Sequence, residues 1–327
     1  MVTETGFEPA LNFADRALLD VVVEHLVALT GPRPRVVVAF SGGVDSTVLA
    51  DKLVRGRRKL GSLRLVHVDH GLQAASAQWS RQCARQARGW RVPFTALRVR
   101  VKFNKGDSPE AAARDARYAA LAAELEQGEV LVTAQHRDDQ VETLLLQLFR
   151  GAGVAGLSAM PAIAPFGAGR IARPLLQASR GTLVEYATQR KLRWIEDPTN
   201  AQNRFARNYL RHEVLPAIRA RWAGVDLAIA RSARNMADAQ VILSSVASAD
   251  LCRVADGAGL SVARLKALPL TRRMNALRQF IRNAGCLLPP YATTMELAAD
   301  LLAVRADAMP EVRWGNMVMK RRAGRLE

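Results

Sequence analysis

The sequence predicts an α/β protein with a doubly wound parallel sheet, followed by a smaller helical domain. Short apolar runs alternate with longer stretches of helical periodicity through the first part of the chain, as in consecutive βαβ units. A turn with two glycines directly follows the first of these runs. Beyond about residue 216 only helical spacings recur. We therefore expect two domains in these 327 residues, a catalytic domain over 1–216 and a helical, basic domain over 217–327.

The elements expected in the first domain alternate between strand and helix. One helix start is marked by Ser108-Pro109, where the serine caps the helix and the proline takes its first position. The uncharged stretch 151–169 contains Pro161 and Pro165, so we interpret it as a loop and not as a membrane span. The expected strands are about 35–40, 63–68, 94–101 and 129–134, and the expected helices are about 44–55, 75–89, 109–127 and 138–149.

The second domain combines helical core patterns with a high density of positive charge. Apolar residues recur at helical spacing near 227–230, 241–246 and 277–281. No acidic residue lies between Asp256 and Glu296. The formal net charge of +17 indicates either a polyanionic partner or a basic surface that is only solvated. The nucleotide site described below favours a partner, tRNA or another RNA. The basic residues of this interval are Arg264, Lys266, Arg272, Arg273, Arg278 and Arg282.

Residues 41–46, with the sequence SGGVDS, predict a nucleotide site. They join a buried strand to a helix, so backbone N–H groups, the partial positive charge of the helix start and two serine hydroxyls can surround a pyrophosphate. A Walker A loop is excluded because no lysine follows until Lys52. The carboxylate of Asp45 is a metal ligand or a stabiliser of the helix start. The cofactor-binding residues expected here are Ser41, Gly42, Gly43, Val44, Asp45 and Ser46.

A second polar cluster, TAQHRDDQVET at residues 133–143, begins at the end of the fourth expected strand. Asp138, Asp139 and Glu142 lie three or four positions apart, so their carboxylates can converge. Such crowding is unfavourable unless a cation lies between the acids. Mg²⁺ bound with ATP phosphates and the ammonium of an amine substrate both fit, with Asp45 and Asp138 as metal ligands. Acids that only stabilise a helix start are the alternative.

Cysteine usage and the N-terminus predict a cytoplasmic protein. Cys83, Cys252 and Cys286 show no C-x-x-C spacing, so neither a zinc site nor a disulfide framework is indicated. The N-terminus contains Glu4 and Glu8 and lacks the apolar segment of a signal peptide. We expect no membrane partner, and the sequence leaves open whether two copies form a homodimer.

The string SGGVDS behind a strand resembles the loop of the PP-loop, or N-type, ATP pyrophosphatase superfamily. Further strings make the chain similar to one family of it, tRNA(Ile)-lysidine synthetase, over about residues 35–216. Members can carry a further C-terminal domain, and this chain stops about where it would begin. The strings are HVDHGL (67–72), SPEAAARDARY (108–118), TAQHRDDQVETLLLQLFRGAGVAGLSAM (133–160), RPLL (173–176) and WIEDPTNAQNRFARNYLRHEVLP (194–216).

The resemblance implies a reaction that splits ATP between its α and β phosphates. Free L-lysine would be joined to C2 of the wobble cytidine in the CAU anticodon of tRNA(Ile), through an adenylated cytidine, with release of AMP and pyrophosphate. The lysidine formed pairs with A instead of G. ATP and Mg²⁺ are the implied cofactors, and tRNA(Ile) and free lysine are the implied partners.

The family's functional residues carry over onto matching positions of this chain. Residues 41–46 would hold ATP and its metal, and the three acids of the second cluster would handle lysine and Mg²⁺. Lysine must lose a proton before it attacks, because the pKa of its amine is about 10.4, and Asp138 is the expected base, with His136 as the other candidate. The residues that would border the nucleotide are His67, Asp69 and His70. Those that would face tRNA or the adenylated base are Arg114, Arg207, Asn208 and Arg211.

Several alternatives stay open. A PP-loop tRNA thiolase would share the loop and the basic surface, but sulfur transfer generally needs reactive cysteines near the site. An amidotransferase-type synthetase that acts on a small molecule would need a glutaminase domain and would not need a strong positive charge. A non-catalytic RNA-binding protein on the same fold would not need the intact loop and acids. The helix face of Arg114, Arg117 and Tyr118 is either an ion-paired surface or faces phosphates or RNA.

Overall fold

A computed structural model describes residues 15–327 except 70, 72–74, 102–108 and 300–309. His70, which the sequence places at the nucleotide, therefore lies outside the described residues. The chain divides into two compact units, Met1–Arg234 and Asn235–Glu327. This division falls within helix α11 (Val225–Val254), whereas the boundary predicted from the sequence, at residue 216, precedes that helix. The predicted boundary remains a proposal, and the two units are described separately.

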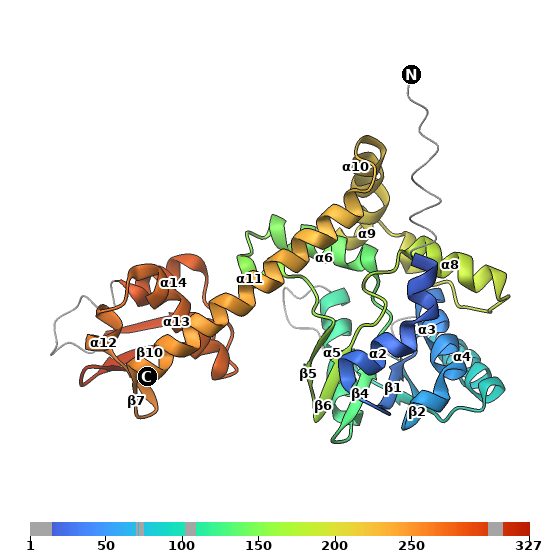
Figure 1. Cartoon of the computed structure of the whole chain (residues 1–327), viewed down its shortest axis with the longest axis horizontal. Coiled ribbons are helices and arrows are strands. Elements are labelled where there is room, and N and C mark those ends of the chain that lie inside the picture. Colours follow the sequence, from blue (N-terminus) through green and yellow to red (C-terminus); the bar gives the residue numbers. More distant parts are fainter. Residues whose placement is uncertain (1–14, 70, 72–74, 102–108, 300–309) are drawn as a thin grey trace. The chain divides into compact units, whose positions relative to one another are not determined.

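The first unit is built on a six-stranded sheet in the order β3-β2-β1-β4-β6-β5 (Figure 1). The central strand β1 pairs in parallel with β2 and β4, so that Val38 lies opposite Leu65 on one side and Val132 on the other. Of the six strands, β5 runs antiparallel to its neighbour β6. The predicted doubly wound parallel sheet is confirmed. The strands are β1 (Arg35–Ala39), β2 (Ser62–Asp69), β3 (Phe94–Arg98), β4 (Glu129–Val132), β5 (Ile163–Phe166) and β6 (Gly169–Ala172).

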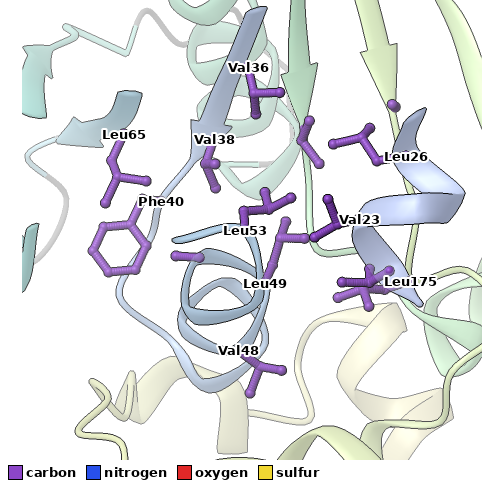
Figure 2. Close-up of a cluster of buried hydrophobic side chains, with 14 of the residues drawn as sticks. Val23, Leu26, Val36, Val38, Phe40, Val48, Leu49, Leu53, Leu65 and Leu175 are labelled. Carbon is purple, nitrogen blue, oxygen red and sulfur yellow. The ribbon is translucent and has the colours of Figure 1, made fainter. Parts of the chain in front are cut away.

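Helices cover both faces of this sheet. Val36 and Val38 of β1 belong to a core cluster with α2, α3, α4 and α8, which Figure 2 shows in part, whereas Val37 packs with α5. The winding therefore reverses between β1 and β4, the point at which sheets of this kind bind ligands. The helices are α2 (Val22–Thr30), α3 (Val44–Arg55), η1 (Arg57–Lys59), α4 (Ser76–Trp90), α5 (Pro109–Glu124), α6 (Arg137–Phe149), α7 (Val154–Leu157) and α8 (Arg180–Gln189).

The strands and helices predicted up to residue 149 are all found, with ends displaced by at most three residues. The prediction that residues 151–169 form a loop is wrong, because this stretch contains α7, β5 and the start of β6. Pro165 suggested a loop because proline lacks a backbone N–H. It lies in β5, an edge strand, where a missing N–H is tolerated. No helix among the described residues is long and apolar enough to span a membrane.

A series of short helices follows α8 in the first unit. Asp197 caps the first of them, accepting a hydrogen bond from the N–H of Thr199 at 2.9 Å. These helices bring the DPTN segment and the arginines behind it towards α6, which α9 contacts. They are η2 (Pro198–Ala201), α9 (Ala206–Tyr209), η3 (Leu210–Val214) and α10 (Leu215–Arg221), followed by the start of α11.

The second unit contains a five-stranded sheet in the order β7-β8-β11-β10-β9 together with helices. The prediction of a smaller second domain is confirmed, but this unit contains a sheet in addition to the predicted helices. The strands escaped the sequence analysis because they are short and mix buried with basic residues; in β10, Met319 and Arg321 are buried and the residues between and beside them are exposed. The elements are β7 (Ala255–Asp256), β8 (Gly259–Ser261), α12 (Val262–Lys266), α13 (Leu270–Asn283), α14 (Tyr291–Ala298), β9 (Glu311–Trp314), β10 (Met317–Arg322) and β11 (Arg325–Leu326).

The core beneath the first sheet face gives a stability prediction. Leu49 of α3 is completely buried, so Leu49→Ala should lower the free energy of unfolding by about 2–5 kcal/mol, through lost burial and a residual cavity. Urea unfolding followed by tryptophan fluorescence measures this, because Trp90 and Trp194 pack against the same cluster. Leu148→Ala, at a position that is 50% exposed, is the control and should cost far less. Equal losses would contradict the assigned core.

Candidate active site

The SGGVDS turn lies between β1 and α3, at the carboxyl edge of the sheet. Gly42 has φ +82°, a left-handed conformation that glycine adopts without strain. A Cβ there would come within 2.6 Å of Ile195 and 2.7 Å of the Cys83 sulfur. The Ser46 hydroxyl accepts from the Gly42 N–H at 3.1 Å and lies 3.0 Å from the Ser41 hydroxyl. The turn is thus held closely by its own hydroxyls and by the chain around it.

The start of α3 leaves donors available for an anion. Gly43 is its N-cap and no side chain caps the helix, so the N–H groups of the first turn lack protein acceptors of the usual kind. Such a helix start favours phosphate or pyrophosphate, because its dipole adds a partial positive charge. The predicted cofactor-binding residues of the turn therefore lie together in a geometry that suits a pyrophosphate.

The predicted acids of α6 converge with Asp45 around His136. The buried imidazole has Nε2 3.7 Å from Asp45 and 3.5 Å from Asp139, and Nδ1 3.5 Å from Asp138. Burial alone would lower the pKa of His136, but the attraction of Asp139, with contributions from Asp138 and Asp45, outweighs it and raises the pKa to about 10. His136 is therefore an imidazolium at neutral pH and serves as a fixed cation among three carboxylates.

Asp138 is held from three sides. It accepts hydrogen bonds from the Arg180 N–H at the start of α8 and from Arg219 of α10, each at 2.9 Å, and it faces His136. Burial would raise the pKa of this carboxyl, but His136, Arg180 and Arg219 hold the pKa well below its usual range. A carboxylate in this state accepts protons poorly. The pKa direction argues against the expected role of Asp138 as general base.

Glu142 is completely buried and bound by two arginines. Arg211 donates to its two oxygens at 2.7 and 3.0 Å, and the Arg207 Nε lies 3.1 Å away. Arg207 also donates to the Thr143 hydroxyl at 2.9 Å. Burial raises the pKa of Glu142, against the opposing effect of Arg211. These arginines, predicted to face tRNA or the adenylated base, contact the acids of the site, and Arg211 reaches Asp139 as well, at 3.5 Å.

The acids need no metal ion for charge balance, because the protein supplies cations to them. Among the described residues no group of three or more histidines, cysteines or acids is arranged as metal ligands. Mg²⁺ nevertheless fits Asp45, whose Oδ1 is buried without a hydrogen-bond partner. This ion is commonly held by one or two carboxylates together with substrate phosphates. Asp138, the other predicted ligand, is already occupied by Arg180 and Arg219 and fits less well.

Of the residues predicted to border the nucleotide, the described ones, His67 and Asp69, lie at the carboxyl end of β2. The ring Nδ1 of buried His67 is 2.9 Å from the Phe40 carbonyl oxygen, which ties β2 to β1. Asp69 accepts from the Gly71 N–H at 2.9 Å and lines an open pocket of about 380 Å³. This pocket extends along α4 and β3, towards Arg98, and away from the acidic cluster.

Two of the predicted substrate-binding residues differ from the rest. The Asn208 amide donates to the carbonyl oxygens of Thr199 and Gln202, each at 3.0 Å, so it anchors the DPTN segment. Arg114 is exposed and stacks on Tyr118, with 5.1 Å between guanidinium and ring centre.

Sequence reasoning missed two residues that complete the site. Ile195 donates its N–H to the Gly42 carbonyl oxygen at 2.8 Å and covers the turn. Arg219 binds Asp138 and Asp226. Neither carries a local signal, because Arg219 lies 81 positions from Asp138 and an isolated arginine on a short helix is commonplace. Ile195 falls inside a matched string but looks like an ordinary core residue.

The comparisons with known proteins agree with this geometry. The profile of the PP-loop domain family matches residues 17–218, and that of the TilS substrate binding domain matches residues 260–327. The chain belongs to the tRNA(Ile)-lysidine synthase family. The relative from Methylococcus capsulatus is 42% identical over 294 residues, covering 88% of this chain and 67% of the relative. Those from Alkalilimnicola ehrlichii and Pectobacterium atrosepticum are 40% and 41% identical, covering 94% and 92% of this chain and 69% of each relative.

A solved structure shares the fold. The U34-tRNA thiolase NcsA from Methanococcus maripaludis superposes with a TM-score of 0.56 over 70% of this chain and 80% of that one. At 13% sequence identity this likeness shows the fold alone. The tRNA(Ile)-lysidine synthase family thus shares its PP-loop fold with proteins of other chemistry.

The turn of this family member can be tested through its glycines. Gly42→Ala introduces a Cβ into a positive-φ position and against Ile195 and Cys83, so it should lower the free energy of unfolding by more than about 1 kcal/mol. Gly43→Ala is the matched control, because its Cβ would meet nothing closer than 3.5 Å and its φ is −69°. Chemical denaturation of both variants measures the difference. Equal stability would show that the turn is not packed as described.

The charge of His136 can be measured directly. Its pKa is about 10 in the folded protein and about 6.5 when unfolded, so its contribution to stability is complete below about pH 6.5 and is lost as the pH rises towards 10. The imidazole NMR signals of His136 should not titrate between pH 6 and 8, whereas histidines of the urea-unfolded chain should. Asp139→Asn should lower the pKa of His136. A midpoint near 6.5 in the folded wild type would refute the ion cluster.

Proposed function

We propose that this chain joins free L-lysine to C2 of the wobble cytidine in the CAU anticodon of tRNA(Ile), using ATP. One observation carries the proposal: an open helix start behind SGGVDS and a charge-balanced cluster of acids meet at the point where the winding of the sheet reverses. Membership of the tRNA(Ile)-lysidine synthase family supports it. A thiolase is not favoured, because Cys83 is buried with its pKa raised to about 12 by burial, which disfavours the reactive thiolate.

In the first step the cytidine O2 would attack the α-phosphate of ATP and pyrophosphate would leave. The N–H groups at the start of α3 and the hydroxyls of Ser41 and Ser46 would bind the departing pyrophosphate and stabilise the charge that develops on it. Asp45 would hold Mg²⁺ with these phosphates, and the ion would neutralise part of their charge. The free Asp45 oxygen supports this assignment.

In the second step the lysine ε-ammonium would give a proton to Asp45 or Asp139, and the free amine would attack C2 of the adenylated cytidine, breaking its bond to O2 and releasing AMP. The acidic cluster would attract the lysine ammonium, with Asp139 and Asp45 less fully occupied by protein donors than Asp138 and Glu142. We assign Asp138 to fixing His136 and Arg219 and not to proton abstraction, because its pKa is lowered. Asp138→Asn should still slow lysine transfer from a preformed adenylate, since those partners would shift.

The RNA partner would be bound in part by the basic surface of the second unit. Arg272 and Arg273 contribute less than the sequence suggests, because Arg272 pairs with buried Asp250 and Arg273 donates to four carbonyl oxygens. Exposed Arg264, Lys266 and Arg282 support the proposal. Location in the cytoplasm fits the free cysteines and the tRNA substrate. A homodimer is a separate proposal, which sedimentation of the purified chain can decide.

The decisive assay incubates the chain with ATP, labelled lysine and tRNA(Ile) carrying CAU, followed by nucleoside analysis. We expect lysidine, with AMP and pyrophosphate formed in equal amounts, and with sustained turnover only when both lysine and RNA are present; RNA without lysine should give at most one pyrophosphate per adenylated tRNA. Methionine tRNA with the same anticodon is the specificity control. Pyrophosphate release without RNA, or no lysine-containing nucleoside, would refute the function.

The role of the turn has its own variant. Ser46→Ala removes the hydroxyl that binds the Gly42 N–H and would face pyrophosphate, so kcat/KM for ATP should fall by about 10²-fold. Ser62→Ala is the matched control. Ser62 is exposed at the amino end of β2, away from the carboxyl edge of the sheet where the turn lies, so this variant should leave the rate unchanged. Steady-state pyrophosphate release measures both variants. Similar rates would remove the hydroxyl from the mechanism.

A further inference from the structure

Arg173 is a buried arginine without an acidic partner. It directly follows β6 and is 8% exposed, and its Nη1 donates to the Pro161 carbonyl oxygen at 2.8 Å. Its Nε is buried with no hydrogen-bond partner, and among the described residues no carboxylate forms an ion pair with it. Buried Arg137 and half-buried Arg211, by contrast, each bind acids. A guanidinium stays charged in proteins, so burial of this charge without a counter-ion is costly.

A phenol, Tyr118, and a second cation, Arg114, lie beside Arg173. Tyr118 receives a hydrogen bond from the Gln135 amide at 3.1 Å, so its own O–H is available to donate to a ligand. The Arg114 guanidinium lies 5.1 Å from the Tyr118 ring centre and pairs with no carboxylate of the described chain. Burial lowers the pKa of Arg173 and the nearby charge of Arg114 lowers it further, against the opposing effect of Tyr118. Arg114 and Arg173 thus both lie next to Tyr118.

We propose that Arg173, Arg114 and the Tyr118 hydroxyl form a phosphate-binding site beside the SGGVDS turn. Two guanidinium groups and a phenol are suited to phosphate oxygens, which accept several hydrogen bonds at once. The position of Arg173 in the sheet agrees with a site beside this turn. Arg173 follows β6, and β6 pairs with β4, which in turn pairs with β1. At strand spacings of about 4.8 Å, the site lies roughly 10 Å along the sheet edge from the turn that follows β1.

The inference rests on the proposed function, because both substrates of that reaction carry phosphate. A phosphodiester of the RNA next to the target cytidine would place the base over the acidic cluster. The phosphates of ATP are the other source of the same chemistry. In either case the bound anion would supply the negative charge that Arg173 and Arg114 lack in the protein itself.

The test measures binding of each substrate separately, without lysine, in three variants of the full chain. Arg114→Gln removes one exposed charge, Tyr118→Phe removes only the hydroxyl, and Arg173→Lys keeps the charge but loses the planar fork. Arg85→Gln, an exposed position on α4, is the control for a general loss of charge. Thermal unfolding checks each fold, and if Arg173→Lys is unstable the other two variants decide.

If the site binds an RNA phosphate, Arg114→Gln should weaken tRNA binding by about tenfold and reduce the slope of log affinity against log salt by about 0.7, with ATP affinity unchanged. If it binds ATP, the affinity for ATP should fall by a similar factor, with the tRNA slope unchanged. Tyr118→Phe should reduce the same affinity about threefold. Variants that match Arg85→Gln for both ligands would overturn the inference. Failure to form lysidine would refute the proposed function without affecting these binding measurements.

Discussion

The structure of the site depends on the neutralisation of buried carboxylates by cations of the protein. Asp45, Asp138 and Asp139 surround the imidazolium of His136, and Glu142 lies beneath Arg211 and Arg207. Removing one member would leave a buried charge uncompensated, which is far more costly than the pair is stabilising. The cluster therefore constrains α6, α8, α9 and α10 to meet at one edge of the sheet.

This constraint also determines what the site can bind. Because the acids are already balanced, an incoming ammonium or Mg²⁺ finds acceptors only where an oxygen is not fully used, as on Asp45. Donors for an anion are provided separately, by the uncapped start of α3. In the proposed reaction the departing phosphate would thus lie at the end of β1 and the amine at the end of the adjacent strand β4. That division suits a reaction in which a nucleotide is first transferred and then displaced.

The sequence predicts the parts of this arrangement that are local. The strand, the glycine turn and the helix of residues 35–55 are determined by adjacent residues, and so are the acids on one face of α6. The pairing of those acids is not local, because Arg211 lies 69 positions from Glu142 and Arg219 lies 81 from Asp138. Helical spacing likewise finds the helices of the second unit, whereas its short strands are stabilised by pairing between distant segments.

Comparison of Arg211 with Arg173 shows why pairing, and not sequence type, distinguishes structural from binding cations. Both lie within strings that resemble the same family, Arg173 directly after β6 and Arg211 on η3. Arg211 is satisfied by Glu142 and cannot turn to RNA without leaving that buried acid to Arg207 alone. Arg173 has no carboxylate partner among the described residues; it donates to the Pro161 carbonyl oxygen, and its Nε lacks an acceptor that, in our proposal, a bound anion supplies. A buried charge that gains a counter-charge only when a ligand binds contributes to the free energy of binding, and this distinguishes a binding cation from a structural one.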